Sequence, residues 1–284
     1  VSLDEHKKNP SDFGLWFTNS KFANQDMQWD TKYGNGFPGW HIECSGLAIK
    51  YLGEDLDIHC GGVDNIFPHH TNEIAQSEAY LGKKWCNYWM HAEHLNDASG
   101  KMSKSSGETL TLSTLINKNY HPLSYRYLCL TSHYRKQLVF TYETLDGAQN
   151  AYFKLLSRIK TLKEEGVLEE DKFNYYKSLF EKELSNDLNT ANALTVLFDL
   201  LKDDINDTTK LELVKSFDEV LSLDLIRKNE VDESLKQYIE DKIKEREIAK
   251  ENKNYALADQ IREELKSKNI IIKDSREGTT YELL

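Results

Sequence analysis

Two lysines in a glycine-flanked turn are the residues whose types and spacing most strongly suggest chemistry in this 284-residue chain. Lys101 and Lys104 lie in the sequence Lys-Met-Ser-Lys-Ser, which Gly100 precedes and Gly107 follows closely. A flexible loop of this kind can close over a polyphosphate, and its ammonium groups can neutralise the charge that develops as a phosphate bond breaks. A solvated basic turn is the alternative interpretation. The loop therefore favours a protein that binds a polyphosphate and assists the breaking of a phosphate bond.

A second group of residues has the donor types of a zinc site. His69 and Glu73 are four residues apart after Pro68, so they project from one face of a predicted helix. Imidazole, carboxylate and thiolate are ordinary zinc donors, and the fold would have to bring Cys44 to the other two. A surface ion pair and a core cysteine are the alternatives. His70 competes with His69, because adjacent side chains point in different directions, and the residue types leave that choice open.

A third element is a glycine pair followed by a carboxylate. Gly62 and Asp64 belong to the sequence Gly-Gly-Val-Asp after a predicted strand. Glycine lets the backbone approach a nucleotide closely, and a carboxylate two residues on can accept ribose hydroxyls. Trp40, four residues before Cys44, could wall a substrate pocket or lie in the core. Each of these signals is weak alone.

Composition narrows the class of protein. No run of about 18 apolar residues occurs and the first residues do not form a secretory signal, so we expect neither a membrane span nor secretion. Four sparse cysteines indicate a reducing cytoplasm rather than a disulfide scaffold. The net charge of −11 argues against general nucleic-acid binding but leaves room for a local basic stripe. The candidates, with a solvated helix face as the alternative, are Lys242, Lys244, Arg246 and Lys250.

The elements that must position these residues form a predicted βαβ unit. A short strand at Asp57–His59 runs into a glycine turn, a helix follows from His69 to Leu81, and Gly82 ends it. The next strand covers Cys86–His91. This order predicts a parallel α/β sheet. We expect the aromatic-rich segment Asp12–Trp40 to be an irregular inserted connection rather than sheet.

Helical periodicity dominates after about residue 108. Apolar stripes at steps of three and four residues predict amphipathic helices that pack as a bundle. We expect Gly166 to end the first helix and Ile270–Ile272 to form a short strand. The stripes comprise Leu145, Ala148, Tyr152, Leu155, Ile159 and Leu162; then Leu194, Leu197, Phe198 and Leu201; then Ile239, Ile243, Tyr255, Ala258, Ile261 and Leu265.

Taken together, these motifs resemble the cysteinyl-tRNA synthetase family of class I aminoacyl-tRNA synthetases, over essentially the whole chain. The Lys-Met-Ser-Lys-Ser loop is one of the two class I signatures. The segments that carry the resemblance are Asn9–Trp16, Phe37–Ser45, Asp57–Ser77, Tyr88–His91, Ser185–Thr190 and Tyr255–Arg262.

The resemblance implies a role for each candidate residue. Cys44, His69 and Glu73 match the family's zinc ligands, which selects His69 over His70. Lys104 matches a residue that contacts ATP, and Lys101 would help it stabilise the departing pyrophosphate. The remaining matches are Gly62 and Asp64 with the adenosine-binding turn, and Trp40 with a wall of the amino-acid pocket.

The implied fold class is α/β followed by all-α. Residues 1–107 would form the C-terminal half of a Rossmann-like catalytic domain, with the end of a connective insertion and the zinc site. Residues 108–142 would form a stem-contact region, and residues 143–284 a helical anticodon-binding domain.

The implied activity is cysteine–tRNA ligation. L-cysteine is activated with ATP and Mg²⁺ to cysteinyl-adenylate and transferred to the 3′ end of tRNA(Cys), with one Zn²⁺ binding the substrate thiolate. Serine and alanine would be rejected by the missing metal bond, a larger discrimination than the ~1–3 kcal/mol of a methylene-sized difference in shape. We expect a cytoplasmic monomer.

The chain also departs from the family pattern. It contains no His-x-Gly-His sequence and lacks an upstream cysteine that would be a further zinc ligand, so it resembles the C-terminal portion of the enzyme and is not expected to form cysteinyl-adenylate alone. We expect Cys60, beside the glycine pair, to be a small buried thiol. The alternatives are a paralogue that ligates cysteine to a small amine, a non-catalytic tRNA- or zinc-binding module, and a zinc hydrolase.

Overall fold

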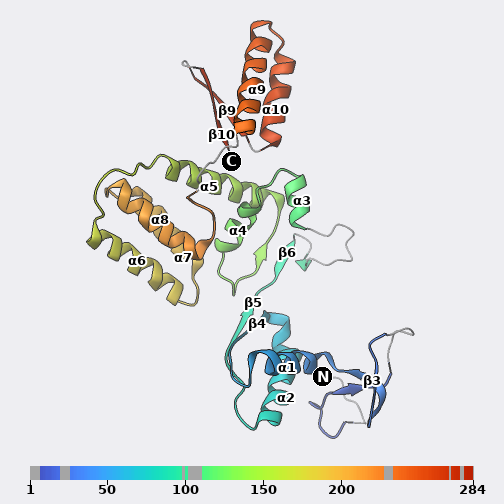
Figure 1. The fold of residues 1–284 in the computed structure, drawn as a ribbon. Coiled ribbons are helices and arrows are strands. Elements are labelled where there is room, and N and C mark those ends of the chain that lie inside the picture. The colour runs from blue at the N-terminus through green and yellow to red at the C-terminus, as the bar shows by residue number, and fades with distance from the viewer. Residues whose placement is uncertain are drawn as a thin grey trace. The chain divides into compact units, whose positions relative to one another are not determined.

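The computed structural model describes residues 7–19, 26–97, 100–101, 111–226, 233–268, 270–275 and 278–283. The chain forms two compact units, which are considered separately below (Figure 1). The first comprises Val1–Leu95 with Tyr134–Leu138, and the second comprises Asn96–His133 with Val139–Leu284. In the part of the chain that the structure describes, no helix combines the length and apolar character that a membrane crossing requires.

The first unit begins with a small antiparallel sheet. Its strands are β1 (Trp16–Phe17), β2 (Trp29–Thr31) and β3 (Gly34–Pro38), in the order β1-β3-β2. The prediction that this segment contains no sheet is therefore wrong. Strands of two to five residues are too short to show a period of two, and the turn into β3 uses Gly34 at φ +105°.

The predicted βαβ unit is confirmed. Strand β4 (Leu56–Gly62) pairs in parallel with β5 (Cys86–Ala92), and helix α2 (Thr71–Leu81) connects them before Gly82 ends it at φ +66°. Helix α1 (Trp40–Leu52), which sequence periodicity did not reveal, packs against α2. The buried centre of this unit comprises Leu56, Trp85 and Cys86, with Ala48, Ile49, Leu81 and Trp89 packed against it.

Three details of this region correct the sequence analysis. The glycine pair lies inside β4 rather than in a turn after it. Regular α-helix begins at Thr71, not at His69, because Phe67 has extended backbone angles inside the wide turn η2 (Ile66–His70), which follows the 3₁₀ turn η1 (Val63–Asn65). The thiol of Cys60 is exposed rather than buried.

A second small sheet has the strand order β7-β6-β8. It comprises β6 (Leu95–Asp97), β7 (Gly100–Lys101) and β8 (Leu138–Val139). Strands β6 and β7 pair antiparallel, with Asn96 opposite Lys101. The strand entering the predicted lysine loop is thereby anchored by backbone pairing.

The second unit is mainly helical. Its first helices are α3 (Leu112–Asn117), α4 (Pro122–Leu130), α5 (Tyr142–Lys160), α6 (Glu170–Ser185), α7 (Thr190–Lys202) and α8 (Asp207–Leu221). The first predicted stripe is confirmed on α5, where all of its members up to Ile159 are buried. Helix α5 ends at Lys160 rather than at Gly166, and the Thr161 hydroxyl donates a hydrogen bond of 2.7 Å to the Arg158 carbonyl, one of the carbonyls that the helix end leaves open.

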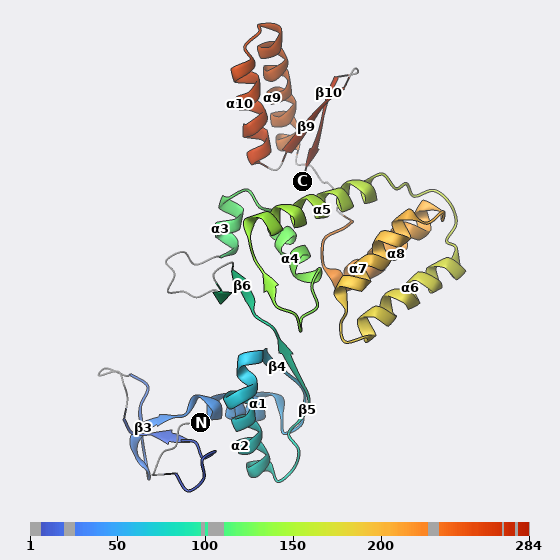
Figure 2. The ribbon, with the colours of Figure 1, turned by 180° about the vertical axis from the view of Figure 1, so that it is seen from behind.

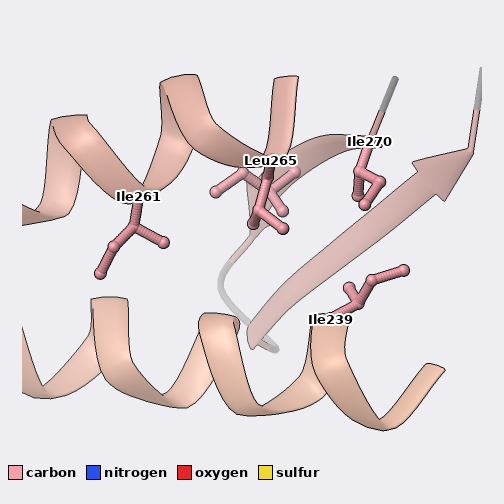
Figure 3. Packing of buried hydrophobic residues seen from close by; sticks show 5 residues of the cluster. Ile239, Ile261, Leu265 and Ile270 are labelled. Atoms are coloured by element: carbon pink, nitrogen blue, oxygen red, sulfur yellow. The ribbon is translucent and has the colours of Figure 1, made fainter. Parts of the chain in front are cut away.

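The C-terminal residues form a separate helix-and-hairpin cluster, best followed in the rear view (Figure 2). Helices α9 (Glu233–Glu251) and α10 (Tyr255–Ser267) pack together, and β9 (Ile270–Ser275) pairs antiparallel with β10 (Gly278–Leu283). The predicted strand at Ile270–Ile272 is confirmed. Figure 3 shows the apolar centre of this cluster, which consists of Ile239, Ile261, Leu265, Ile270 and Ile272.

Candidate metal centre

Three predicted ligands meet in the first unit. Cys44 lies on α1, His69 in η2 and Glu73 in the first turn of α2. One ligand atom from each of them lies within 4.8 Å of the others. The packing of α1 against α2 therefore brings the Cys44 thiol to an imidazole and a carboxylate that lie 25 and 29 residues later in the sequence.

Glu73 is the most unusual member of this group, because its side chain is fully buried. The Nε2 atom of His69 lies 2.7 Å from Oε1 and the Nε2 atom of His59 lies 3.1 Å from Oε2. Neither contact is aligned as a hydrogen bond, so neither oxygen accepts one from the residues that the structure describes. Burial raises the pKa of Glu73 to about 7.

These features fit a divalent cation. A buried carboxylate without hydrogen bonds costs about 1–3 kcal/mol or more, and a coordinated cation offsets this cost. Burial, followed by the nearby carboxylates of Glu73 and Glu43, raises the pKa of the Cys44 thiol. A bound metal would reverse both pKa shifts, because it stabilises the thiolate and the carboxylate. Sulfur, nitrogen and oxygen donors in this combination are typical of zinc.

The ring of His69 is held on two sides by the first residues of α1. Trp40 stacks on its face, with ring centroids 3.8 Å apart and an interplanar angle of 12°. The Nδ1 atoms of His41 and His69 lie 2.7 Å apart. Burial, and then the neighbouring His41, lowers the pKa of His69. The imidazole is therefore favoured in the neutral form that a metal ligand requires.

A second set of potential donors shares Glu73. His59, His70 and Glu73 also bring three ligand atoms within 4.8 Å of one another. The Nδ1 atom of His70, however, lies 2.8 Å from Nε2 of His91. Burial, and then the neighbouring histidines, lowers the pKa of His70 to about 4. Only the set with His69 includes a cysteine, Cys44, and a thiolate is a common zinc ligand, so we favour the first set.

Sequence reasoning missed the other histidines around these ligands. His41, His59 and His91 all have ring contacts within the cluster. Their signal in the sequence was the concentration of histidines in the first unit, but nothing in their spacing indicated a common location. Gly61 makes room for one of these rings, since a Cβ there would lie 2.6 Å from Cε1 of His70.

The predicted nucleotide turn lies at the end of β4. Gly62 is the last residue of the strand, and a Cβ at this position would overlap the carboxylate of Asp64. The Asp64 side chain is 52% exposed, with Oδ1 3.9 Å from Nε2 of His94. The glycine therefore leaves room for the close approach of this carboxylate, which remains accessible to a ligand.

The structure describes only some of the remaining predicted site residues. Lys101 lies in β7, while Lys104 lies outside the described residues. Trp40 is 55% exposed and borders the metal ligands, as a pocket wall would.

The predicted basic stripe on α9 is largely engaged within the chain. Arg246 is 3% exposed and donates two hydrogen bonds to Asp274, at 2.9 and 3.0 Å. Lys250 pairs with the same carboxylate at 2.9 Å, and Lys242 pairs with Glu245 and Glu264. The suggestion that Arg246 is available to a nucleic acid is therefore wrong, because an intramolecular ion pair occupies it.

Two family models match parts of this chain. The family model described as "tRNA synthetases class I (C) catalytic domain" matches residues 1–150, and the model described as "DALR domain" matches residues 179–225.

The curated relatives agree with this placement. A "Cysteine--tRNA ligase" of Treponema denticola is 42% identical over 317 residues, covering 100% of this chain and 64% of that protein. Another, of Borreliella afzelii, is 42% identical over 305 residues, covering 98% of this chain and 62% of that protein. The chain thus spans somewhat less than two thirds of the length of these relatives.

Among solved structures, the ternary complex of Agrobacterium radiobacter K84 agnB2 LeuRS, tRNA and LeuAMS matches with a TM-score of 0.47 and 12% identity, over 69% of this chain and 32% of that one. This likeness is too distant to support an argument. Since the catalytic-domain model covers more than half of the 284 residues, the chain belongs to the family of class I (C) tRNA synthetases.

Proposed function

We propose that this chain carries the zinc side of the active site of a cysteine–tRNA ligase. The observation that carries the proposal is the convergence of Cys44, His69 and Glu73 around a fully buried carboxylate that accepts no hydrogen bond from the described residues. The family match and the names of the relatives support it. The substrates are L-cysteine, ATP and tRNA(Cys).

The proposed metal ligands are the three residues just named. When bound there, Zn²⁺ supplies a direct bond to the substrate's thiolate, which the hydroxyl of serine and the methyl of alanine cannot replace. Trp40 stacks on His69 and borders the place where the amino acid would lie. The protein's own contribution at this point is selection and orientation of cysteine.

The proposed ATP site uses the two other motifs. Gly62 and Asp64 would receive the adenosine, with the carboxylate accepting the ribose hydroxyls. The carboxylate of cysteine would attack the α-phosphate of ATP, and pyrophosphate would leave. Mg²⁺ on the phosphates would offset part of their charge. Lys101 and Lys104 would neutralise the charge that develops on the pyrophosphate. No side-chain nucleophile is required.

We assign a different function to each of three successive segments of the chain. Residues 1–107 would activate cysteine, residues 108–142 would form the connecting stem-contact region, and residues 143–284, which include the DALR match, would bind the anticodon region of tRNA(Cys). The helical second unit favours tRNA over a small amine as the acceptor of the cysteinyl group, because a small acceptor needs no such surface.

Metal analysis tests the ligand set. We expect the wild-type chain to retain zinc after dialysis, and Cys44→Ser and Glu73→Ala to lose it. Unchanged zinc content in both variants would refute the site.

Cobalt substitution then tests the substrate. We expect L-cysteine to add a thiolate-to-cobalt charge-transfer band to the cobalt-loaded chain, while L-serine leaves the spectrum unchanged. An equal response to both amino acids would refute selection through the thiol.

A further inference from the structure

His41 makes a close polar contact with a proposed metal ligand. It is the second residue of α1, is 8% exposed, and its Nδ1 lies 2.7 Å from Nδ1 of His69. The other ring nitrogen of His69, Nε2, lies 2.7 Å from the Glu73 carboxylate. The two nitrogens of His69 thus face different partners: Nε2 faces the Glu73 carboxylate, and Nδ1 faces His41.

The chemistry of the pair fixes where the protons must be. A histidine that binds a metal through Nε2 keeps its proton on Nδ1. His69 would then donate the Nδ1 hydrogen to Nδ1 of His41, which must accept it through a lone pair. This requires His41 to carry its own proton on Nε2. The two imidazoles are therefore both neutral, with defined and different tautomers.

The neutral acceptor matters because of the charge of the site. Metal-bound histidines usually donate to a carboxylate, a backbone carbonyl or water. Two of the three proposed ligands in this chain, the Cys44 thiolate and the Glu73 carboxylate, already carry negative charge. An imidazole acceptor orients His69 without adding a further negative charge beside an incoming substrate thiolate.

The surrounding contacts favour His41 over its neighbours for this role. Among the described residues, His59 contacts Glu73 and His70 contacts His91. Trp40 restricts the plane of the His69 ring from its face, and His41 restricts its rotation from its edge. Because Cys44 lies three residues after His41 on the same helix, α1 supplies one ligand and also holds another.

We propose that His41 is a positioning residue for the metal site, holding His69 in the Nδ1–H tautomer with Nε2 toward the cation. This inference rests on the metal site proposed above. It predicts that removing the acceptor of His41 weakens metal binding although no ligand is lost.

Two variants separate the hydrogen bond from packing. His41→Phe keeps a ring of similar size but removes the acceptor, and His41→Asn keeps an acceptor near the position of Nδ1. Zinc affinity is measured on the chain by competition with a chelator. We expect His41→Phe to weaken affinity by about 10–100-fold, as loss of such outer partners does, and His41→Asn to restore most of it. His133→Phe, on the second unit, is the control and is expected to leave affinity unchanged.

Long-range ¹H–¹⁵N spectra of the histidine rings give a second readout. We expect the zinc-loaded wild type to show His69 protonated at Nδ1 and His41 at Nε2. Circular dichroism establishes that each variant is folded before its affinity is interpreted.

The possible results separate the two proposals. A wild-type chain that binds no zinc would overturn the metal site and this inference with it. A wild type that binds zinc with an unchanged affinity in His41→Phe would overturn this inference alone. Equal weakening in His41→Phe and His41→Asn would also overturn it, because a hydrogen-bond acceptor would then not be the feature that matters.

Discussion

Two regions of the molecule bury charged groups in opposite ways. In the first unit, the Glu73 carboxylate is fully buried and accepts no hydrogen bond from the described residues. In the C-terminal cluster, both terminal nitrogens of the buried Arg246 donate to Asp274, and only its Nε lacks a partner among the described residues. The first arrangement costs stability unless a cation joins it, whereas in the second the counter-ion compensates the buried charge, so that removing one partner is what destabilises. A buried carboxylate that accepts no hydrogen bond from the described residues thus marks a candidate functional site, whereas a buried charge paired with a counter-ion marks a structural contact.

The largest expected effect comes from removing the buried carboxylate of Glu73. Glu73→Gln preserves shape and removes the carboxylate, so we expect zinc to be lost from the purified chain. The metal-free variant should be at least as stable as the metal-free wild type, because a desolvated carboxylate has been removed. Metal analysis and thermal unfolding in a chelator measure both effects. Retained zinc would show that the Glu73 carboxylate is not needed to bind the metal. A clear loss of metal-free stability would show that Glu73 has a structural role.

Removing the charge of Asp274, the counter-ion of Arg246, should have the opposite effects: stability should fall and zinc content should not change. Asp274→Asn leaves the guanidinium of Arg246 buried without its counter-ion, which costs about 3–5 kcal/mol for a fully buried pair and less here, since the Asp274 side chain is 40% exposed. We expect lower stability of the C-terminal cluster in urea unfolding and unchanged zinc content. Loss of zinc in this variant would contradict the independence of the two regions.

The same pair predicts a dependence on pH. Hydrogen bonds from Arg246, and then from Lys250, hold the pKa of Asp274 well below its usual range. A depressed pKa in the folded state gives stability that is present above the unfolded pKa of about 4 and is lost as pH falls toward the folded pKa. The difference in unfolding free energy between wild type and Asp274→Asn should therefore shrink as pH is lowered from 7 toward 2. A constant difference would show that the charge of Asp274 does not produce the effect.

The smallest expected effect comes from a matched pair of glycines. At Gly61 an added Cβ would meet the His70 ring at 2.6 Å, whereas at Gly46, on α1, nothing lies within 4 Å. We expect Gly61→Ala to destabilise the first unit by about 1–3 kcal/mol through overpacking. Gly46→Ala should stabilise it by roughly 0.5–1 kcal/mol, because alanine is favoured in a helix interior. Thermal unfolding measures both, and equal changes in the two variants would contradict close packing of the histidine cluster.

Sequence patterns predicted the long and periodic parts of this fold. The stripe on α5 and the βαβ order around α2 follow from regular spacing, which the backbone geometry of helices and strands imposes directly. The short strands of the first unit carry too few residues for a period to be visible. The hairpin strand β10 was also missed; it pairs along its length with β9, which in turn contacts α10.

The candidate site also has parts that the sequence predicted and parts that only the structure showed. His69 and Glu73 could be paired from their spacing on a helix, and Cys44 joined them through the family motif. The contact between His41 and His69 joins residues 28 positions apart and exists only because α1 packs on α2. Outer contacts of this kind have no sequence spacing of their own, so the structure was needed to find them.

The central claim is that Cys44, His69 and Glu73, rather than His59, His70 and Glu73, hold the metal. The two donor sets share only Glu73, and each contains one of the adjacent residues His69 and His70, so the zinc content of His69→Gln and His70→Gln tests the claim most directly. The account predicts that His69→Gln loses zinc and that His70→Gln retains it. Retention in His69→Gln with loss in His70→Gln would contradict the assignment.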